Sequence, residues 1–120
     1  MQAMITIEKE LEGLYQTRKT EKGIEAEFTA AETLSFFSGH FPRMPILPAV
    51  AIVDISHYFA QKVAAESFEI QKVSNMRLKQ PIHAREFIKI TLDRESERDY
   101  NVIWKSAENR TLVELSLEAF

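Results

Sequence analysis

Apolar and polar residues alternate along several short segments of the chain, which is the pattern of strands that bury one face and expose the other. In the clearest case, Ile24, Ala26 and Phe28 alternate with two glutamates. Turn-forming residues separate the segments, so we predict six strands, the first two as a hairpin and the last four as an antiparallel meander. The six segments are residues 14–19, 24–28, 68–79, 86–94, 100–106 and 112–119.

Residues 49–66 have a different pattern, with no Gly or Pro and with apolar residues on nearly every face of a helix. Pro48 precedes this segment and suits the first turn of a helix. A helix that is apolar all round needs cover on more than one side. We therefore predict an α+β domain in which a curved six-stranded sheet wraps around one central helix, with a second subunit supplying further cover.

The composition is that of one ordinary globular domain. The 120 residues contain no linker-like stretch, 45% of them are apolar, and the net charge is -3. We expect a single domain over residues 1–120 that folds without a cofactor. The absence of cysteine excludes disulfides and a thiol nucleophile, and makes the cytoplasm the default expectation.

Other classes of function are not supported by the sequence. No apolar run approaches the roughly 18 residues of a membrane helix, and the first residues lack the order of a signal peptide. Basic and acidic residues are interspersed and the pI is about 5.6, so nucleic-acid binding is not expected. The three histidines do not have the spacing of a metal site, and we expect no metal.

Candidate chemistry is concentrated between the second strand and the helix. Residues 39–48 read Gly-His-Phe-Pro-Arg-Met-Pro-Ile-Leu-Pro and contain three of the four prolines, which predicts an irregular, rigid loop. Residues 37–50, which include this run, resemble the signature of the beta-hydroxyacyl-acyl-carrier-protein dehydratases. Residues 75–82, Asn-Met-Arg-Leu-Lys-Gln-Pro-Ile, resemble a second segment of that family. The resemblance implies the hotdog fold.

The resemblance also implies an activity and a catalytic pair. Members dehydrate a 3-hydroxyacyl thioester to the trans-2-enoyl product, using a signature histidine and an acidic residue fourteen positions later, in a site shared by two subunits. The corresponding residues are His40 and Asp54. The expected partners are an acyl thioester of acyl carrier protein or coenzyme A, and a second copy of the chain.

The roles follow from the chemistry of the residue types. An imidazole with a pKa near neutral can remove the C2 proton, so His40 is the candidate base. Burial on an apolar helix should raise the pKa of Asp54 and favour the protonated form that a general acid needs. The unpaired N–H groups at the helix start, at Ala49 and Val50, are candidate donors to the thioester carbonyl.

Four further residues are candidates for contact with the acyl chain, although core packing explains such side chains equally well. These residues are Phe41, Met44, Pro48 and Tyr58.

Three positions depart from the family pattern. Ala49 replaces a glycine, Tyr58 stands where dehydratases commonly have Gln, with Gln61 following later, and residues 84–86 read Ala-Arg-Glu where the family has Pro-Gly-Asp. These departures keep two other functions open. One is a hotdog thioesterase, in which the acidic residue activates water, and the other is a non-catalytic acyl-binding or dimerising subunit.

Some polar residues have two interpretations. His57 is close enough in sequence to touch Asp54, but residues at such positions more often pack the helix or a dimer contact. His83 has the character of a turn residue. Arg77 and Lys79 alternate on one predicted strand and fit either an acidic carrier protein or an ordinary solvated strand face.

Overall fold

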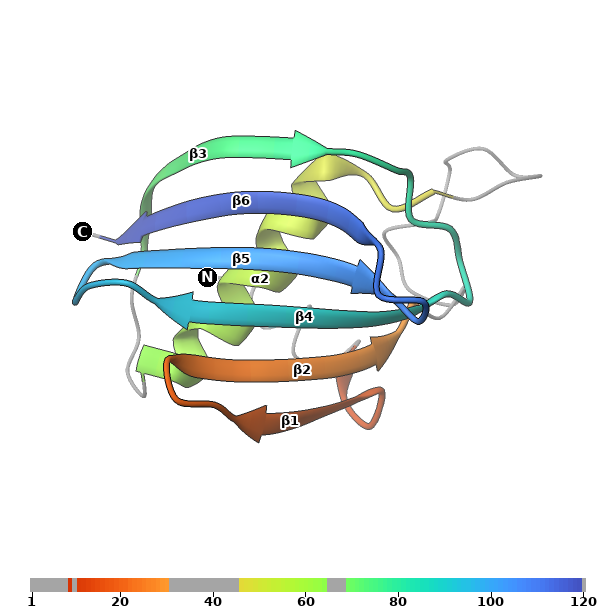
Figure 1. The fold of residues 1–120 in the computed structure, drawn as a ribbon, viewed down its shortest axis with the longest axis horizontal. Helices are drawn as coiled ribbons and strands as arrows, with labels where there is room; N and C mark the ends of the chain where they lie inside the picture. The colour runs from red at the N-terminus through yellow and green to blue at the C-terminus, as the bar shows by residue number, and fades with distance from the viewer. Residues whose placement is uncertain (1–8, 10, 31–45, 65–68, 120) are drawn as a thin grey trace.

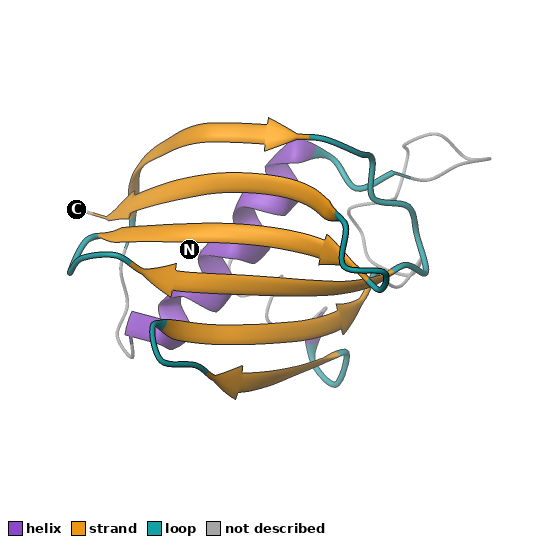
Figure 2. Cartoon of the chain, viewed as in Figure 1, coloured by secondary structure: helices purple, strands orange, loops and turns teal. Residues whose placement is uncertain are grey.

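The computed structural model describes residues 9, 11–30, 46–64 and 69–119. They form one six-stranded antiparallel sheet with a single long helix lying across one of its faces (Figures 1 and 2). The elements are β1 (Tyr15–Lys19), β2 (Gly23–Thr29), α2 (Ala49–Ala64), β3 (Ile70–Leu78), β4 (Phe87–Arg94), β5 (Asp99–Ser106) and β6 (Thr111–Ala119). Each predicted strand is present, with ends that differ by at most two residues. Residues 65 and 66 of the predicted helix, and most of the predicted rigid loop, lie outside the described residues.

The order of the strands differs from the prediction. The sheet runs β1-β2-β4-β5-β6-β3, so β4, β5 and β6 form a meander while β3 pairs with β6 and not with β4. The predicted four-stranded meander is therefore wrong in its first strand. Every residue of β3 is at least partly exposed, which suits an edge strand with a neighbour on one side only. Alternation shows that a segment is a strand but does not reveal its neighbour.

The register places the apolar residues of neighbouring strands side by side. Ala26 of β2 pairs with Ile90, Ile90 pairs with Trp104, and Trp104 pairs with Val113, which makes one row across four strands. All four side chains are fully buried. The rows on this face form the core, because the helix packs onto them.

The helix is attached to the sheet by aromatic packing and by one buried polar contact. Phe59 packs against Phe28, with ring centroids 6.5 Å apart, and against Tyr15 at 5.1 Å. The indole N–H of Trp104 donates to the Ser56 hydroxyl at 3.0 Å, and both residues are fully buried. Irregularities in the β3–β6 and β5–β6 registers add twist, so the sheet curves around the helix as predicted. In the part of the chain that the structure describes, no helix has the length and apolar character needed to cross a membrane.

Candidate functional site

The start of α2 presents backbone N–H groups that the helix itself does not use. The Pro48 carbonyl accepts the first hydrogen bonds of the helix, from Ala51 at 3.0 Å and from Ile52 at 3.2 Å. The N–H groups of Ala49 and Val50 come before these bonds, where an α-helix has no acceptor for them. The Val50 side chain is 67% exposed. The helix therefore begins where the sequence predicts. The unpaired N–H groups give its N-terminus a partial positive charge.

Asp54 lies one turn further along α2 and is half-buried. Burial raises the pKa of its carboxyl above the ordinary value, and the attraction of nearby His57 opposes part of that rise. The direction agrees with the expectation from the sequence. A carboxyl with a raised pKa holds its proton at a higher pH and is better suited to act as a general acid.

Asp54 belongs to a line of residues on one face of the helix. Val50, Asp54, His57 and Gln61 follow one another at spacings of four, three and four residues, so they lie above one another. At 100° per residue, this line lies about opposite to Phe59, which packs against Phe28 of the sheet. The Asp54 carboxyl is therefore on the side of the helix that is turned away from the sheet of its own chain.

His57 is the most buried polar member of this line. It is only 5% exposed, and its Nε2 lies 3.4 Å from Nε2 of Gln61. Reasoning from the sequence favoured a packing role for His57 and gave none to Gln61. The signal that would have added Gln61 to Asp54 and His57 is its spacing of seven and four residues from them.

Tyr58 occupies a different environment, between the helix and β1. Its hydroxyl shares a 2.7 Å hydrogen bond with the hydroxyl of Tyr15, and the Nζ of Lys62 lies 4.9 Å from the centre of its ring. The side chain is 7% exposed. These contacts agree with the packing interpretation, and contact of Tyr58 with a substrate stays a prediction.

The structure describes only some of the remaining predicted site residues. His40, Phe41 and Met44 lie outside the described residues, so the pairing of His40 with Asp54 stays a prediction. Pro48 is described and caps the helix through its carbonyl. His83 is a turn residue, as expected, and its Nδ1 lies 2.9 Å from Oε1 of Glu86. Among the residues that the structure describes, no group of three His, Cys, Asp or Glu side chains is placed to hold a metal ion.

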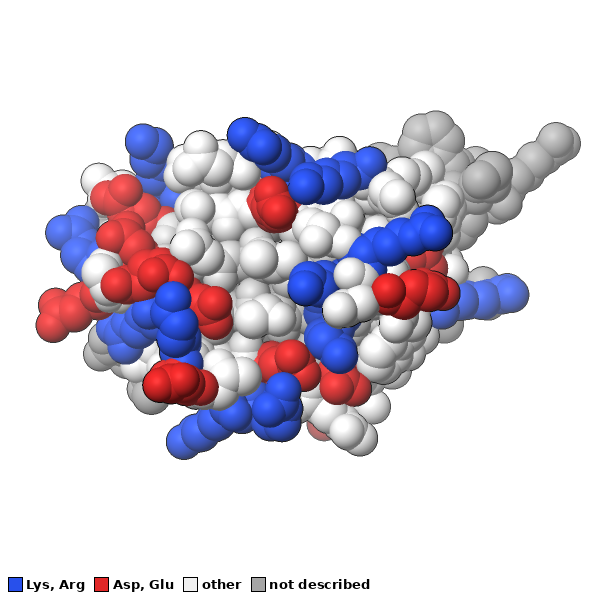
Figure 3. All heavy atoms as spheres, in the orientation of Figure 1, with Lys and Arg blue, Asp and Glu red and all other residues white. Residues whose placement is uncertain are grey.

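Basic residues gather along the β3 edge of the sheet. Figure 3, which views the face turned away from the helix, shows Lys and Arg side chains along this edge. Lys79 lies 3.6 Å from Glu114, and Arg77 is opposite Glu114 in the register. Both basic residues are exposed and lie beside an acidic residue of their own sheet. This arrangement agrees with a solvated strand face, and contact with a carrier protein stays a prediction.

The comparison with protein families gives one match. A model described as "ApeI-like: ApeI dehydratase" matches residues 16–116, which is most of the chain. This match supports the predicted relation to dehydratases, although it does not single out those that act on acyl carrier protein. No curated protein matches the sequence.

Known structures resemble the fold closely at low sequence identity. The dehydratase heterocomplex ApeI:P from Xenorhabdus doucetiae has a TM-score of 0.76 and 18% identity, covering 88% of this chain and 92% of that one. A hypothetical thioesterase with coenzyme A from Streptococcus pneumoniae TIGR4 has a TM-score of 0.74 and 9% identity, covering 99% and 93%. An uncharacterised protein from Erwinia carotovora subsp. atroseptica has a TM-score of 0.71 and 21% identity, covering 89% and 92%. These likenesses confirm the hotdog fold.

Proposed function

The chain belongs to the ApeI-like dehydratase family, and from this premise we propose that it dehydrates a 3-hydroxyacyl thioester to the trans-2-enoyl thioester. The acyl group is carried by acyl carrier protein or coenzyme A. The reaction removes a proton from C2, forms the C2–C3 double bond and breaks the C3–O bond, so that the hydroxyl leaves as water. It needs a base, an acid and a donor to the carbonyl oxygen, on which negative charge develops.

Asp54 is the proposed acid. Its carboxyl is half-buried with a raised pKa, and this is the observation on which the proposal mainly rests beside the family. The protonated carboxyl gives its proton to the C3 hydroxyl as the C3–O bond breaks. After the reaction the carboxylate regains a proton from solvent, which the half-exposed position permits.

Backbone N–H groups at Ala49 and Val50 are the proposed donors to the thioester oxygen. Val50 and Asp54 are four residues apart, which is about 6 Å along a helix, and side chains lean toward the N-terminus of their helix. The Asp54 carboxyl therefore leans toward these N–H groups. In a 3-hydroxyacyl thioester the carbonyl and the C3 hydroxyl are separated by two carbon–carbon bonds, and this spacing suits both contacts at once.

His40 is the proposed base, on the strength of the resemblance and its position fourteen residues before Asp54. An imidazole that is neutral near pH 7 accepts the C2 proton, and the resulting imidazolium returns it to solvent after the enoyl product has formed. Phe41, Met44, Pro48 and Tyr58 complete the proposal as contacts of the acyl chain.

The proposal includes a homodimer that shares its two sites. Asp54 is turned away from the sheet of its own chain, so groups from elsewhere must cover it, and β3 is an edge strand. Four large apolar side chains among the described residues are exposed, and two of them, Val73 and Leu78, lie on β3. An unpaired strand edge with exposed apolar residues is a template for pairing with a second chain.

The test is an analysis of products from 3-hydroxyacyl and enoyl thioesters linked to coenzyme A and to acyl carrier protein. Mass spectrometry should show the loss or gain of one water with the thioester intact. Release of a free thiol would show hydrolysis of the thioester and would identify a thioesterase instead. In that case Asp54 would activate the attacking water. No turnover of any substrate, with activity appearing only when a homologous subunit is added, would identify a non-catalytic partner subunit.

A further inference from the structure

The turn between β3 and β4 is organised by one carboxylate. Oε1 of Glu86 accepts a hydrogen bond from the His83 N–H at 3.0 Å and lies 2.9 Å from Nδ1 of the same residue. Arg85, between them, has a φ of 75°, a conformation that residues other than glycine rarely adopt. The side chains of His83 and Glu86 are 37% and 33% exposed. Glu86 therefore ties this turn together at the surface and holds a strained backbone in place.

Backbone hydrogen bonds connect the same turn to two distant parts of the chain. On one side, the Ala30 N–H donates to the Glu86 carbonyl at 2.9 Å, and the Arg85 N–H donates to the Ala30 carbonyl at 2.6 Å. On the other side, the Leu47 N–H donates to the Ile82 carbonyl at 2.8 Å. Ile46 forms an isolated antiparallel bridge with His83. The turn is thus fixed between the end of β2 and the start of α2.

The second connection sets the position of the helix start. Leu47 is 1% exposed and Ile82 is fully buried, so their hydrogen bond is protected from water. Only Pro48, whose ring fixes its φ angle, separates Leu47 from Ala49. In Figure 1 the β3–β4 connection runs on the same side of the molecule as the yellow segment that leads into α2. A shift of the turn is therefore passed on to the N–H groups of Ala49 and Val50.

The geometry points to Glu86 as a positioning residue. Its carboxylate fixes the turn between β3 and β4, and this turn determines the position of the start of α2, where the thioester carbonyl binds. The inference rests on the proposed function for the role of that helix start. Glu86 does not touch the substrate. Its effect is on catalytic geometry, where a displacement of about 1 Å can lower the rate on the order of a hundredfold.

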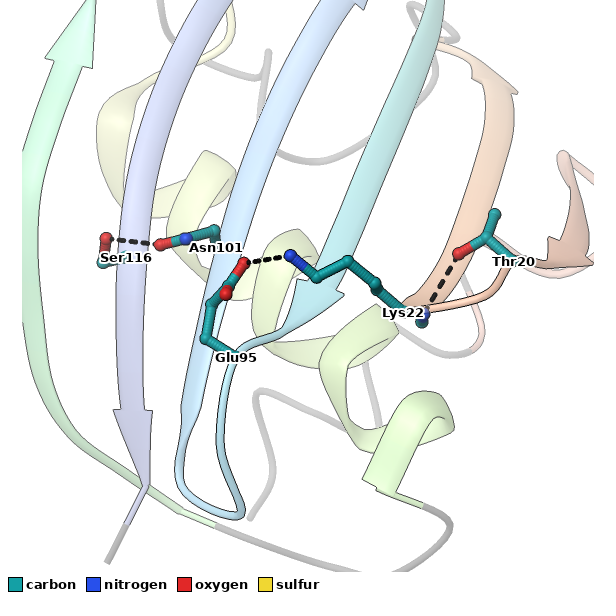
Figure 4. A network of polar contacts seen from close by, with 6 residues as sticks. Thr20, Lys22, Glu95, Asn101 and Ser116 are labelled. Atoms are coloured by element: carbon teal, nitrogen blue, oxygen red, sulfur yellow. Dashed lines mark hydrogen bonds and ion pairs between the residues drawn. The ribbon is translucent and has the colours of Figure 1, made fainter.

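A second surface ion pair provides a matched control. Nζ of Lys22 lies 3.0 Å from Oε1 of Glu95, with the two side chains 54% and 39% exposed. Figure 4 shows this pair, which links the loop before β2 to the residue after β4. The pair has similar exposure, but among the described residues none of its hydrogen bonds reaches the start of α2.

The test compares Glu86→Ala and Glu86→Gln with Glu95→Ala. Steady-state kinetics with an enoyl thioester should show kcat of Glu86→Ala reduced by about ten- to a hundredfold with a smaller change in KM. Glu86→Gln keeps an acceptor oxygen for the His83 N–H and should recover most of the rate. Glu95→Ala should match the wild type. Equal kcat for Glu86→Ala and wild type, or an equal loss in Glu95→Ala, would overturn the inference.

Amide hydrogen exchange tests the structural step without any need for activity. In Glu86→Ala the Leu47 and Ala30 amides should exchange faster and the Ala49 and Val50 resonances should shift, whereas the amides of β5 and β6 should not change. If the wild type shows no dehydration but these changes occur, the proposed function fails and the link from Glu86 to the helix start stands. If Leu47 exchange is unchanged, the link itself is wrong.

Discussion

At the scale of single residues, Asp54 combines a proposed catalytic role with a cost to folding. Its pKa is raised from 3.8 by burial, so the folded protein binds this proton more tightly than the unfolded chain does. The ionised form of Asp54 therefore lowers the stability of the fold. The penalty is relieved as the pH falls through the raised value toward the ordinary one.

The direction of this pKa shift leads to a prediction for the stability of the Asp54→Asn variant. The variant lacks the ionisable group, so we expect its free energy of unfolding at neutral pH to equal or exceed that of the wild type. The difference should shrink as the pH falls below the ordinary aspartate value of about 3.9, where the carboxyl is protonated in both the folded and the unfolded chain. Urea unfolding of the variant and the wild type, at neutral pH and at the lower pH, measures the difference in unfolding free energy under each condition. A variant that is clearly less stable than the wild type at neutral pH would contradict a raised pKa for Asp54.

Ser56 has a structural role that is separate from the proposed chemistry. In Ser56→Ala the buried Trp104 N–H loses its acceptor, and an unsatisfied buried donor costs about 1–3 kcal/mol of unfolding free energy. Ser116→Ala is the control, because the Ser116 hydroxyl donates to Asn101 on the exposed face (Figure 4). That change should cost less than about 0.5 kcal/mol. Chemical denaturation that shows similar losses for both variants would argue against the Ser56 contact.

At the scale of elements, the hairpin of β1 and β2 depends on the close approach of β2 to β4. A Cβ atom at Gly23 would collide with the Leu92 carbonyl oxygen, so Gly23→Ala must push β2 away from its neighbour. We expect a loss of about 1–3 kcal/mol in unfolding free energy, as for an overpacked core. Lys22→Ala is the neighbouring control and removes only an exposed ion pair, which contributes little to the free energy of unfolding. Thermal unfolding of the two variants distinguishes these effects.

The sequence identifies elements well but not their long-range contacts. Ile88, Ile90 and Leu92 alternate with polar residues and are all buried, as their spacing indicates. The pairing of β3 with β6 brings together residues about 40 positions apart, and no local pattern encodes it. The same limit applies to the site. Asp54 is recognisable as a lone carboxyl on an apolar helix, whereas the action of Glu86 on the helix start depends on backbone bonds between segments distant in sequence.

At the scale of the whole molecule, the proposed dimer has a specific test. Leu78 on β3 is 48% exposed and Phe87 on β4 is 40% exposed, so they are matched in exposure but not in position. If two chains join along β3, light scattering of the wild type should give the mass of a dimer, and Leu78→Asp should shift it toward the monomer. Phe87→Asp should leave the mass unchanged. A monomeric wild type, or an equal effect at Phe87, would count against this interface.

Hydration of an enoyl thioester tests most directly whether Asp54 is the acid of a thioester dehydratase, because hydration is the reverse of the same step. Purified wild type and Asp54→Asn are compared by mass spectrometry after circular dichroism has established that both are folded. We predict that the wild type adds one water to the enoyl thioester and that kcat of the variant is lower by about a hundredfold or more. A folded Asp54→Asn variant that hydrates the substrate as fast as the wild type would contradict the account.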